Sequence, residues 1–312
     1  MKNRIIQLAQ KYDVDLVGFG SAERFSPEDA IFKILPETQT VIALGVRVLR
    51  GAYRGVEEGT TFYQYTTMGV ENIEETIMPL AMLNICNFLE DNGYYAMPQK
   101  WNQLIMQEET STNPEVDYTD IFRGIRQEPQ LDFRKTAVAC GLGEIGLHGS
   151  VLTDEFGPFQ RFCYILTDAQ MDPTPITKSH LCDNCGECIK ACPGRAITST
   201  DGIDPWRCAV YYNGAGGRKN PFLPPDSFSE YSNRMDILFG TADFDQEGAQ
   251  DILNHIYCYP PAKHSYKTCI CGKACDRACY IHLEGKGLLT KSFVKPFRKG
   301  EDWTIPDETY MV

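Results

Sequence analysis

The sequence predicts an α+β protein in two parts, a mixed helix-and-strand core followed by a cysteine-rich domain. Helical and strand patterns fill the first half of the chain, whereas ten of the thirteen cysteines follow residue 180. A proline-dotted stretch, "DPTPITKSH", separates the two parts. We therefore predict a core over residues 1–172, a cysteine-rich domain over 173–285 and a C-terminal tail over 286–312. With 312 residues, 43% of them hydrophobic, the chain can form both domains.

The elements of the core follow from hydrophobic spacing. Residues 1–12 have the pattern of an amphipathic helix, and two apolar runs, Val14–Gly20 and Thr40–Val48, have that of strands. Apolar residues at helical spacing predict a long helix from Val70 to a C-cap glycine at Gly93, with a kink at Pro79. A long loop is predicted over residues 100–131 and a helix over 132–140. A glycine-rich turn over 141–149 and a strand over 161–167 follow.

The run "CDNCGECIKACP" has the spacing C-x2-C-x2-C-x3-C-P, which is typical of iron–sulfur ligation. Zinc is the alternative, but zinc sites favour two separated C-x2-C pairs. In a two-cluster arrangement the fourth cysteine of such a run ligates the other cluster. The first three cysteines therefore need one further thiolate, and Cys192 needs three.

The later cysteines supply the missing thiolates. We predict that one [4Fe–4S] cluster is held by Cys182, Cys185, Cys188 and Cys279. The second is predicted to be held by Cys192, Cys208, Cys275 and one of the pair Cys271 and Cys269. We assign Cys271, and the choice between the two stays open. Two clusters of this kind move single electrons and need an acceptor.

Charge and hydropathy limit the possible partners. The net charge of −12 disfavours general binding to nucleic acid or to anionic membranes. The basic stretch "VKPFRKG" is interpreted as a solvated tail. No apolar run approaches the ~18 residues that span a bilayer, and the first residues lack a signal-peptide core. We therefore expect a cytoplasmic protein whose clustered thiols bind metal.

The stretch "GLGEIGLHG" contains G-x-G-x-x-G, but a helix precedes it where a dinucleotide-binding site requires a strand. We therefore reject a nicotinamide site. The glycines allow the backbone either to approach a bulky flat group or to pack tightly.

The motifs "ACGLGEIGLHGSVLTDEFGPFQRFCYILTDA", "CDNCGECIKACPGRAI" and "DPWRCAVYY", with the final cysteines, resemble the superfamily of epoxyqueuosine reductases and reductive dehalogenases. The resemblance implies a nitroreductase-like, cobalamin-binding core joined to a two-cluster ferredoxin-like domain. It places the cofactor-binding residues in the glycine-rich turn, at Gly141, Leu142, Gly143, Gly146, His148 and Gly149. It also implies a proton donor, for which Tyr118 is our candidate and Tyr63 and Tyr65 are alternatives.

The resemblance implies a reductase that passes electrons through two clusters to cobalamin, which cleaves a carbon–halogen or carbon–oxygen bond of a small substrate. The alternative is a protein that delivers electrons to a separate corrinoid protein; a flavin-dependent reductase ranks last. The expected electron donor is a low-potential ferredoxin or flavodoxin. Because the chain is acidic, we expect neither nucleic acid nor a membrane as a partner.

Overall fold

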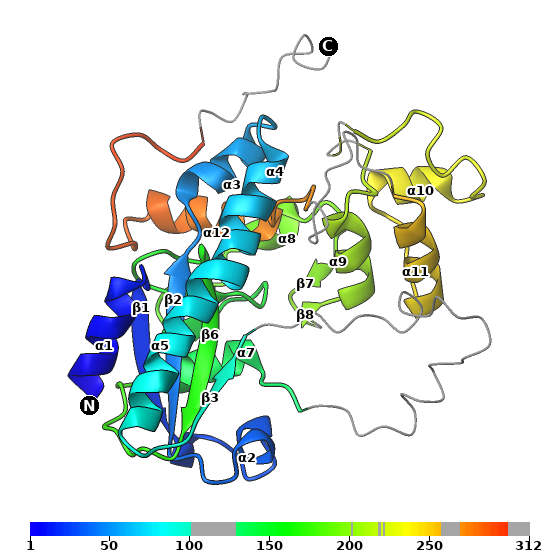
Figure 1. Ribbon diagram of the computed structural model, residues 1–312. Helices are drawn as coiled ribbons and strands as arrows, with labels where there is room; N and C mark the ends of the chain where they lie inside the picture. Colours follow the sequence, from blue (N-terminus) through cyan, green and yellow to red (C-terminus); the bar gives the residue numbers. More distant parts are fainter. Residues whose placement is uncertain (101–128, 201, 218–219, 221, 257–268, 299–312) are drawn as a thin grey trace, which may run out of the picture.

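The computed structural model describes residues 1–100, 129–200, 202–217, 220, 222–256 and 269–298. Its central feature is a four-stranded antiparallel sheet in the order β1-β2-β6-β3 (Figure 1). The strands are β1 (Leu16–Ser21), β2 (Thr40–Arg47), β3 (Ala96–Gln99) and β6 (Gln160–Thr167). The long runs predicted as strands are confirmed within about two residues at each end. The mixture of sheet and helix agrees with the predicted α+β class.

Helices cover both faces of this sheet. Lys2, in α1 (Lys2–Lys11), places its Nζ 4.7 Å from the ring of Phe19 in β1. Gly18, the preceding residue of β1, instead faces Cys140 at the end of α7 (Phe133–Ala139). Successive strand residues point to opposite faces, so α1 and α7 lie on opposite sides of the sheet. The long helix α5 (Met78–Asp91) packs beside α1 (Figure 1).

The predicted helix over Val70–Gly93 differs from the observed one in its first half. Two π-helical segments, η2 (Thr67–Glu71) and η3 (Ile73–Ile77), precede α5. Pro79 lies in the first turn of α5 rather than at a kink in its middle. Because the residues before α5 are themselves helical, Pro79 removes one backbone donor at the junction between the π-helical and α-helical turns. Gly93 ends the helix with a φ of +83°, as predicted for a C-cap glycine.

The core also contains several short elements. They are η1 (Ala22–Arg24), α2 (Ala30–Ile34), α3 (Arg50–Glu57), α4 (Phe62–Thr66), β4 (Glu144–Ile145) and β5 (Val151–Leu152). β4 and β5 pair as a small hairpin that contains part of the glycine-rich turn.

The cysteine-rich part is mostly helical. Its elements are α8 (Glu187–Ala191), β7 (Ile197–Thr198), β8 (Gly202–Ile203), α9 (Pro205–Tyr212), α10 (Arg234–Phe239), α11 (Gln246–Asn254) and α12 (Ala274–Gly285). Helices α9 to α11 enclose a small core of their own around Val210, Phe228 and Ile237. They lie to one side of the sheet in Figure 1.

Helix α12 joins this part to the main core. It packs against α8, and its Tyr280 stacks on Phe159 at 4.2 Å between ring centroids. Phe297, from the predicted tail, is fully buried against the same two rings. The interpretation of this stretch as a solvated tail is therefore wrong at Phe297, although Val294 is fully exposed. A single aromatic residue outweighs its charged neighbours, because burying it removes a large apolar surface from water.

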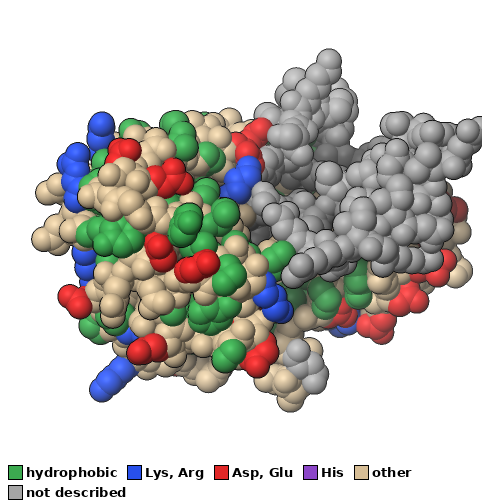
Figure 2. Space-filling model, turned by 60° about the horizontal axis from the view of Figure 1, so that its bottom comes forward, with side chains coloured by type: hydrophobic (Ala, Val, Ile, Leu, Met, Phe, Trp, Pro, Cys, Tyr) green, Lys and Arg blue, Asp and Glu red, His purple; other side chains and the backbone are tan. Residues whose placement is uncertain are grey.

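Figure 2 shows acidic, basic and hydrophobic side chains interspersed over the face that it displays.

Candidate functional site

Four thiols meet between α8 and α12. We call them the first cysteine group: Cys182, Cys185, Cys188 and Cys279. Burial raises the pKa of the Cys279 thiol, and the charges of Asp276 and the other three thiols raise it further. Burial and then Cys185 and Cys182 also raise the pKa of Cys188. These mutual electrostatic effects indicate that the four thiols are near one another.

A second set of thiols includes Cys275, in the first turn of α12. This second cysteine group consists of Cys192, Cys208, Cys271 and Cys275. Burial raises the pKa of Cys208 to about 11, with further contributions from Cys271 and Cys192. Burial, Asp276, Cys271 and Cys208 raise the pKa of Cys275. The members of each predicted set thus influence one another electrostatically, and their role as cluster ligands stays a prediction.

The two groups are connected by one turn of α12. Cys275 belongs to the second group and Cys279 to the first, four residues later. Residues at this spacing lie on one helix face, with Cβ atoms ~5–6 Å apart. Two clusters bound by these groups would therefore lie close together.

The surroundings of the sulfur atoms fit iron–sulfur clusters. Backbone N–H groups donate to cysteine sulfurs from Leu147 to Cys182 at 3.4 Å, from Ala196 to Cys192 at 3.2 Å and from Ala274 to Cys271 at 3.4 Å. Such hydrogen bonds stabilise the negative charge on cluster thiolates and tune the reduction potential. The donor set is all sulfur, as a [4Fe–4S] site requires.

Cys269 has different surroundings from Cys271. Its sulfur is fully buried beside Tyr212 and accepts the N–H of Gly272 at 3.1 Å. Cys271 is the one thiol whose charge is among the main contributions to the pKa of Cys269. Cys271, by contrast, also interacts with Cys192. These contacts favour Cys271 as the ligand, and the assignment stays a prediction.

The glycine-rich turn supports the first cysteine group through Glu144. The carboxylate of this buried residue accepts backbone N–H groups from His180 at 2.6 Å, Leu181 at 3.2 Å and Cys182 at 2.8 Å. Ser179 adds its hydroxyl at 3.1 Å. Burial opposes ionisation, but these donors hold the pKa of Glu144 below its usual range. Glu144 therefore fixes the backbone that leads into the cysteine motif.

The glycines of this turn approach the chain itself. A Cβ at Gly141 would overlap the carbonyl oxygen of Pro175, and one at Gly143 would overlap that of Leu152. A Cβ at Gly149 would crowd the guanidinium of Arg134. Leu142 is buried, and a Cβ at Gly146 would touch Leu152 and His148. The turn is filled by the protein's own atoms, so it does not fit as an open cradle for a corrin ring. The cofactor-binding role predicted for these residues stays a prediction.

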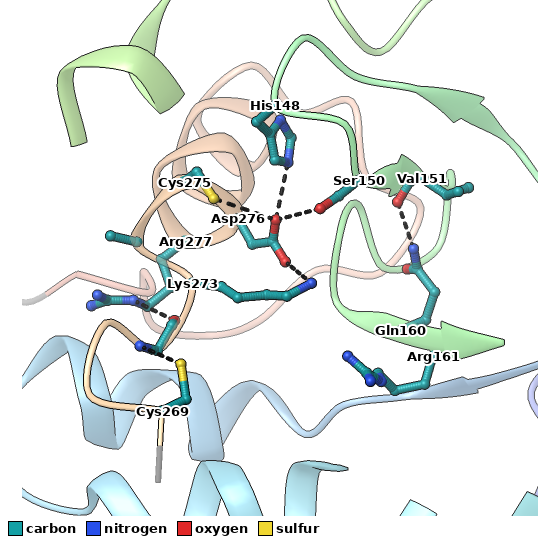
Figure 3. Close-up of polar contacts among 12 residues, drawn as sticks. His148, Ser150, Val151, Gln160, Arg161, Cys269, Lys273, Cys275, Asp276 and Arg277 are labelled. Carbon is teal, nitrogen blue, oxygen red and sulfur yellow. Dashed lines mark hydrogen bonds and ion pairs between the residues drawn. The ribbon is translucent and has the colours of Figure 1, made fainter. Parts of the chain in front are cut away.

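A buried polar network lies between the two cysteine groups, centred on Asp276 of α12 (Figure 3). Its carboxylate accepts the hydroxyl of Ser150 at 2.7 Å and lies 3.1 Å from both His148 Nε2 and Lys273 Nζ. Burial opposes its charge, but Lys273, His148 and Ser150 hold the pKa of Asp276 well below its usual range. His148 is thus anchored by a carboxylate. Asp276 was not predicted as a site residue, because two of its partners, His148 and Ser150, are distant in sequence.

The proposed proton donor, Tyr118, lies outside the described residues. Of the two alternatives, Tyr65 is fully buried, and burial raises its pKa. Tyr63 is half-buried.

Comparisons with known proteins bear on both parts of the site. A family model for a 4Fe-4S binding domain matches residues 178–198, which include all four cysteines of the C-x2-C-x2-C-x3-C run. The epoxyqueuosine reductase of Synechococcus sp. (strain CC9605) is 34% identical over 84 residues, 27% of this chain and 26% of that protein. The tetrachloroethene reductive dehalogenase of Dehalobacter restrictus (strain DSM 9455 / PER-K23) is 38% identical over 83 residues, 25% of this chain and 15% of that protein. The chain is related to these two groups of reductases.

The resemblance to this superfamily that the motifs predicted is therefore confirmed. The aligned segments span about a quarter or less of the curated relatives. A solved reductive dehalogenase, whose structure suggests a mechanism for B12-dependent dehalogenation, aligns with 80% of this chain and 35% of its own. Its TM-score is 0.46 and its identity 16%. None of the helices in the described ranges is long and apolar enough to cross a membrane.

Proposed function

We propose that this chain is an iron–sulfur reductase whose two cysteine groups each hold a [4Fe–4S] cluster and carry electrons to a corrinoid. The observation that carries the proposal is the meeting of eight thiols as two groups of four, joined by one turn of α12. Its support from sequence is the 4Fe-4S binding domain and the relationship to two groups of reductases.

The clusters, when bound, supply one-electron transfer. The chain's own residues hold and tune them. Glu144 fixes the loop of the first group, and backbone N–H groups donate to ligand sulfurs in both groups. Between the groups, Lys273 balances the charge of Asp276, and Ser150 donates a hydrogen bond to it, so that this carboxylate adds less repulsion to electrons arriving nearby.

The resemblance favours cobalamin bound to this chain as the electron acceptor, with reductive cleavage of a carbon–halogen or carbon–oxygen bond as the reaction. The glycine-rich turn supplies no cradle for it, so we derive no step through the corrin. Small organohalides and epoxides are the substrate classes to screen, and a low-potential ferredoxin or flavodoxin is the proposed donor.

A second function is favoured by the filled turn. In this alternative the chain binds no corrin and delivers electrons to a separate corrinoid protein. In such a chain Gly141 and Gly143 have no cofactor to bind, and their tight packing serves only to hold the turn that supports the first cysteine group.

Metal analysis after anaerobic reconstitution with iron, sulfide and cobalamin separates these functions. After gel filtration, about eight irons and one cobalt per chain would support a cobalamin-dependent reductase. About eight irons without cobalt would support the electron-delivery function. Zinc in place of iron, or a single cluster at saturation, would refute the proposal in both forms.

A further inference from the structure

Residues 286–298, which directly follow α12, have a charge opposite to that of the whole chain. They contain four cations and no acid, whereas the net charge of the chain is −12. We call these residues the basic segment. All four of its cations are exposed: Lys286, Lys291, Lys295 and Arg298. The function proposed above assigns this segment no role.

The middle of the basic segment combines positive charge with exposed apolar surface. Lys291 and Lys295 have no ion pair with any residue that the structure describes, and the Nζ of Lys291 lies 4.7 Å from the ring centre of Phe156. Between the two lysines, Phe293 is 52% exposed and Val294 is fully exposed. An apolar centre with a charged rim is the arrangement that protein–protein interfaces use.

The basic segment lies beside the first cysteine group. At its start, the Nζ of Lys286 is 2.5 Å from the carboxylate of Asp183, which is two residues before Cys185. Near its end, the backbone N–H of Phe297 donates to the carboxylate of Glu284 in α12 at 2.8 Å. Both ends of the segment are therefore held close to the helix that contributes a thiol to each cysteine group.

The first cysteine group is also the more accessible of the two. Cys185 is exposed, Cys188 is buried, and the other six predicted ligands are half-buried. A protein that donates electrons must bring its own redox centre close to a cluster, so an exposed ligand marks the side from which a donor can approach. Low-potential electron carriers are acidic proteins, which the chain as a whole repels and the basic segment attracts.

We propose that an acidic, low-potential ferredoxin docks on the basic segment and reduces the cluster of the first cysteine group. The inference rests on the proposed function, because it needs a cluster at that group. One electron leaves the reduced ferredoxin cluster, which is oxidised, and converts a [4Fe–4S]²⁺ cluster of this chain into [4Fe–4S]¹⁺. No bond forms or breaks, and no proton moves. Electron-transfer complexes have small interfaces, so a short segment can provide one.

The test is the rate at which reduced plant-type [2Fe–2S] ferredoxin reduces the reconstituted protein in anaerobic stopped-flow measurements. We expect the second-order rate constant of the wild type to fall as salt is added, because salt screens the attraction. The double variant Lys291→Glu with Lys295→Glu should react about tenfold more slowly at low ionic strength. The matched control is Arg4→Glu with Lys33→Glu, which changes the net charge equally and should react like the wild type. Both control residues are exposed, and Figure 1 shows α2 and the start of α1 at the opposite end of the sheet from α12.

Iron content and reduction by dithionite separate this inference from the proposed function. All three proteins should hold the same amount of iron and be reduced by dithionite to the same extent. A double variant that reacts with ferredoxin as fast as the wild type, or a control that slows equally, overturns the inference. So does a wild type that dithionite reduces and ferredoxin does not, or one that binds vesicles of anionic phospholipid through the segment and reacts with ferredoxin independently of salt. A protein in which dithionite reduces no cluster refutes the proposed function itself, and the inference with it.

Discussion

Glu144 offers a direct test of how the glycine-rich turn supports the first cysteine group. We expect Glu144→Gln to loosen the loop over residues 179–182 without changing the size of the side chain. The carboxylate accepts four hydrogen bonds, three of them from consecutive backbone N–H groups. The glutamine side chain has only one acceptor oxygen, and its NH₂ group would face hydrogen-bond donors of the loop.

The magnitude follows from these contacts. A hydrogen bond to a charged group contributes about 1.5–3 kcal/mol. Loss of two such bonds at a side chain that is only 6% exposed weakens the loop by about 3 kcal/mol or more. That corresponds to an increase of roughly a hundredfold in the open loop population.

The assay is the rate at which a chelator removes iron from the reconstituted protein. The variant should lose about half of its iron much faster than the wild type, because only the first cysteine group depends on this loop. Glu247→Gln is the matched control, since Glu247 is an exposed carboxylate on α11, outside both cysteine groups. If the two variants lose iron at the same rate, the role assigned to Glu144 is wrong.

Three further predictions concern the core. Gly143 has a φ of +117°, and a Cβ there would overlap a backbone oxygen, so Gly143→Ala should lower the free energy of unfolding by about 3 kcal/mol or more. Gly93 has a φ of +83° but lies in open space, so Gly93→Ala should lower it by only about 1 kcal/mol. Chemical denaturation measures both. Phe297→Ala should lower the free energy of unfolding by about 3–5 kcal/mol, and Val294→Ala should leave it nearly unchanged. Equal losses in the two variants would show that the tail does not pack on the core. Burial raises the pKa of Cys140 to about 12, so at pH 8 only about one thiol in ten thousand is ionised. Mass spectrometry should find this cysteine unalkylated by iodoacetamide until the protein is unfolded, and rapid labelling in the native state would contradict its burial.

The sequence predicted the elements whose patterns are local. The strand over Thr40–Val48 follows from a continuous apolar run, and the helix end at Gly93 from a capping glycine, and neither pattern needs a distant partner. The π-helical turns before Met78 were missed, because the apolar spacing of a π-turn over a few residues resembles that of an α-helix.

The site was less predictable, since its contacts are long-range. Spacing indicated the cysteine groups because ligands follow a fixed order in iron–sulfur motifs. The partners of Gly141 and Gly143 could not be identified, as Pro175 and Leu152 approach them only in the folded chain. Glu144 was likewise not predicted, because the sequence around a single acidic residue between glycines does not indicate which backbone N–H groups will donate to it.

The number of clusters is the most direct test of the central claim. Iron and acid-labile sulfide should be measured per chain after complete anaerobic reconstitution of the wild type, Cys269→Ser and Cys208→Ser. The account predicts about eight irons and eight sulfides in the wild type and in Cys269→Ser, and about four of each in Cys208→Ser. A wild type that saturates at four irons, or a Cys208→Ser variant that keeps all eight, would contradict it.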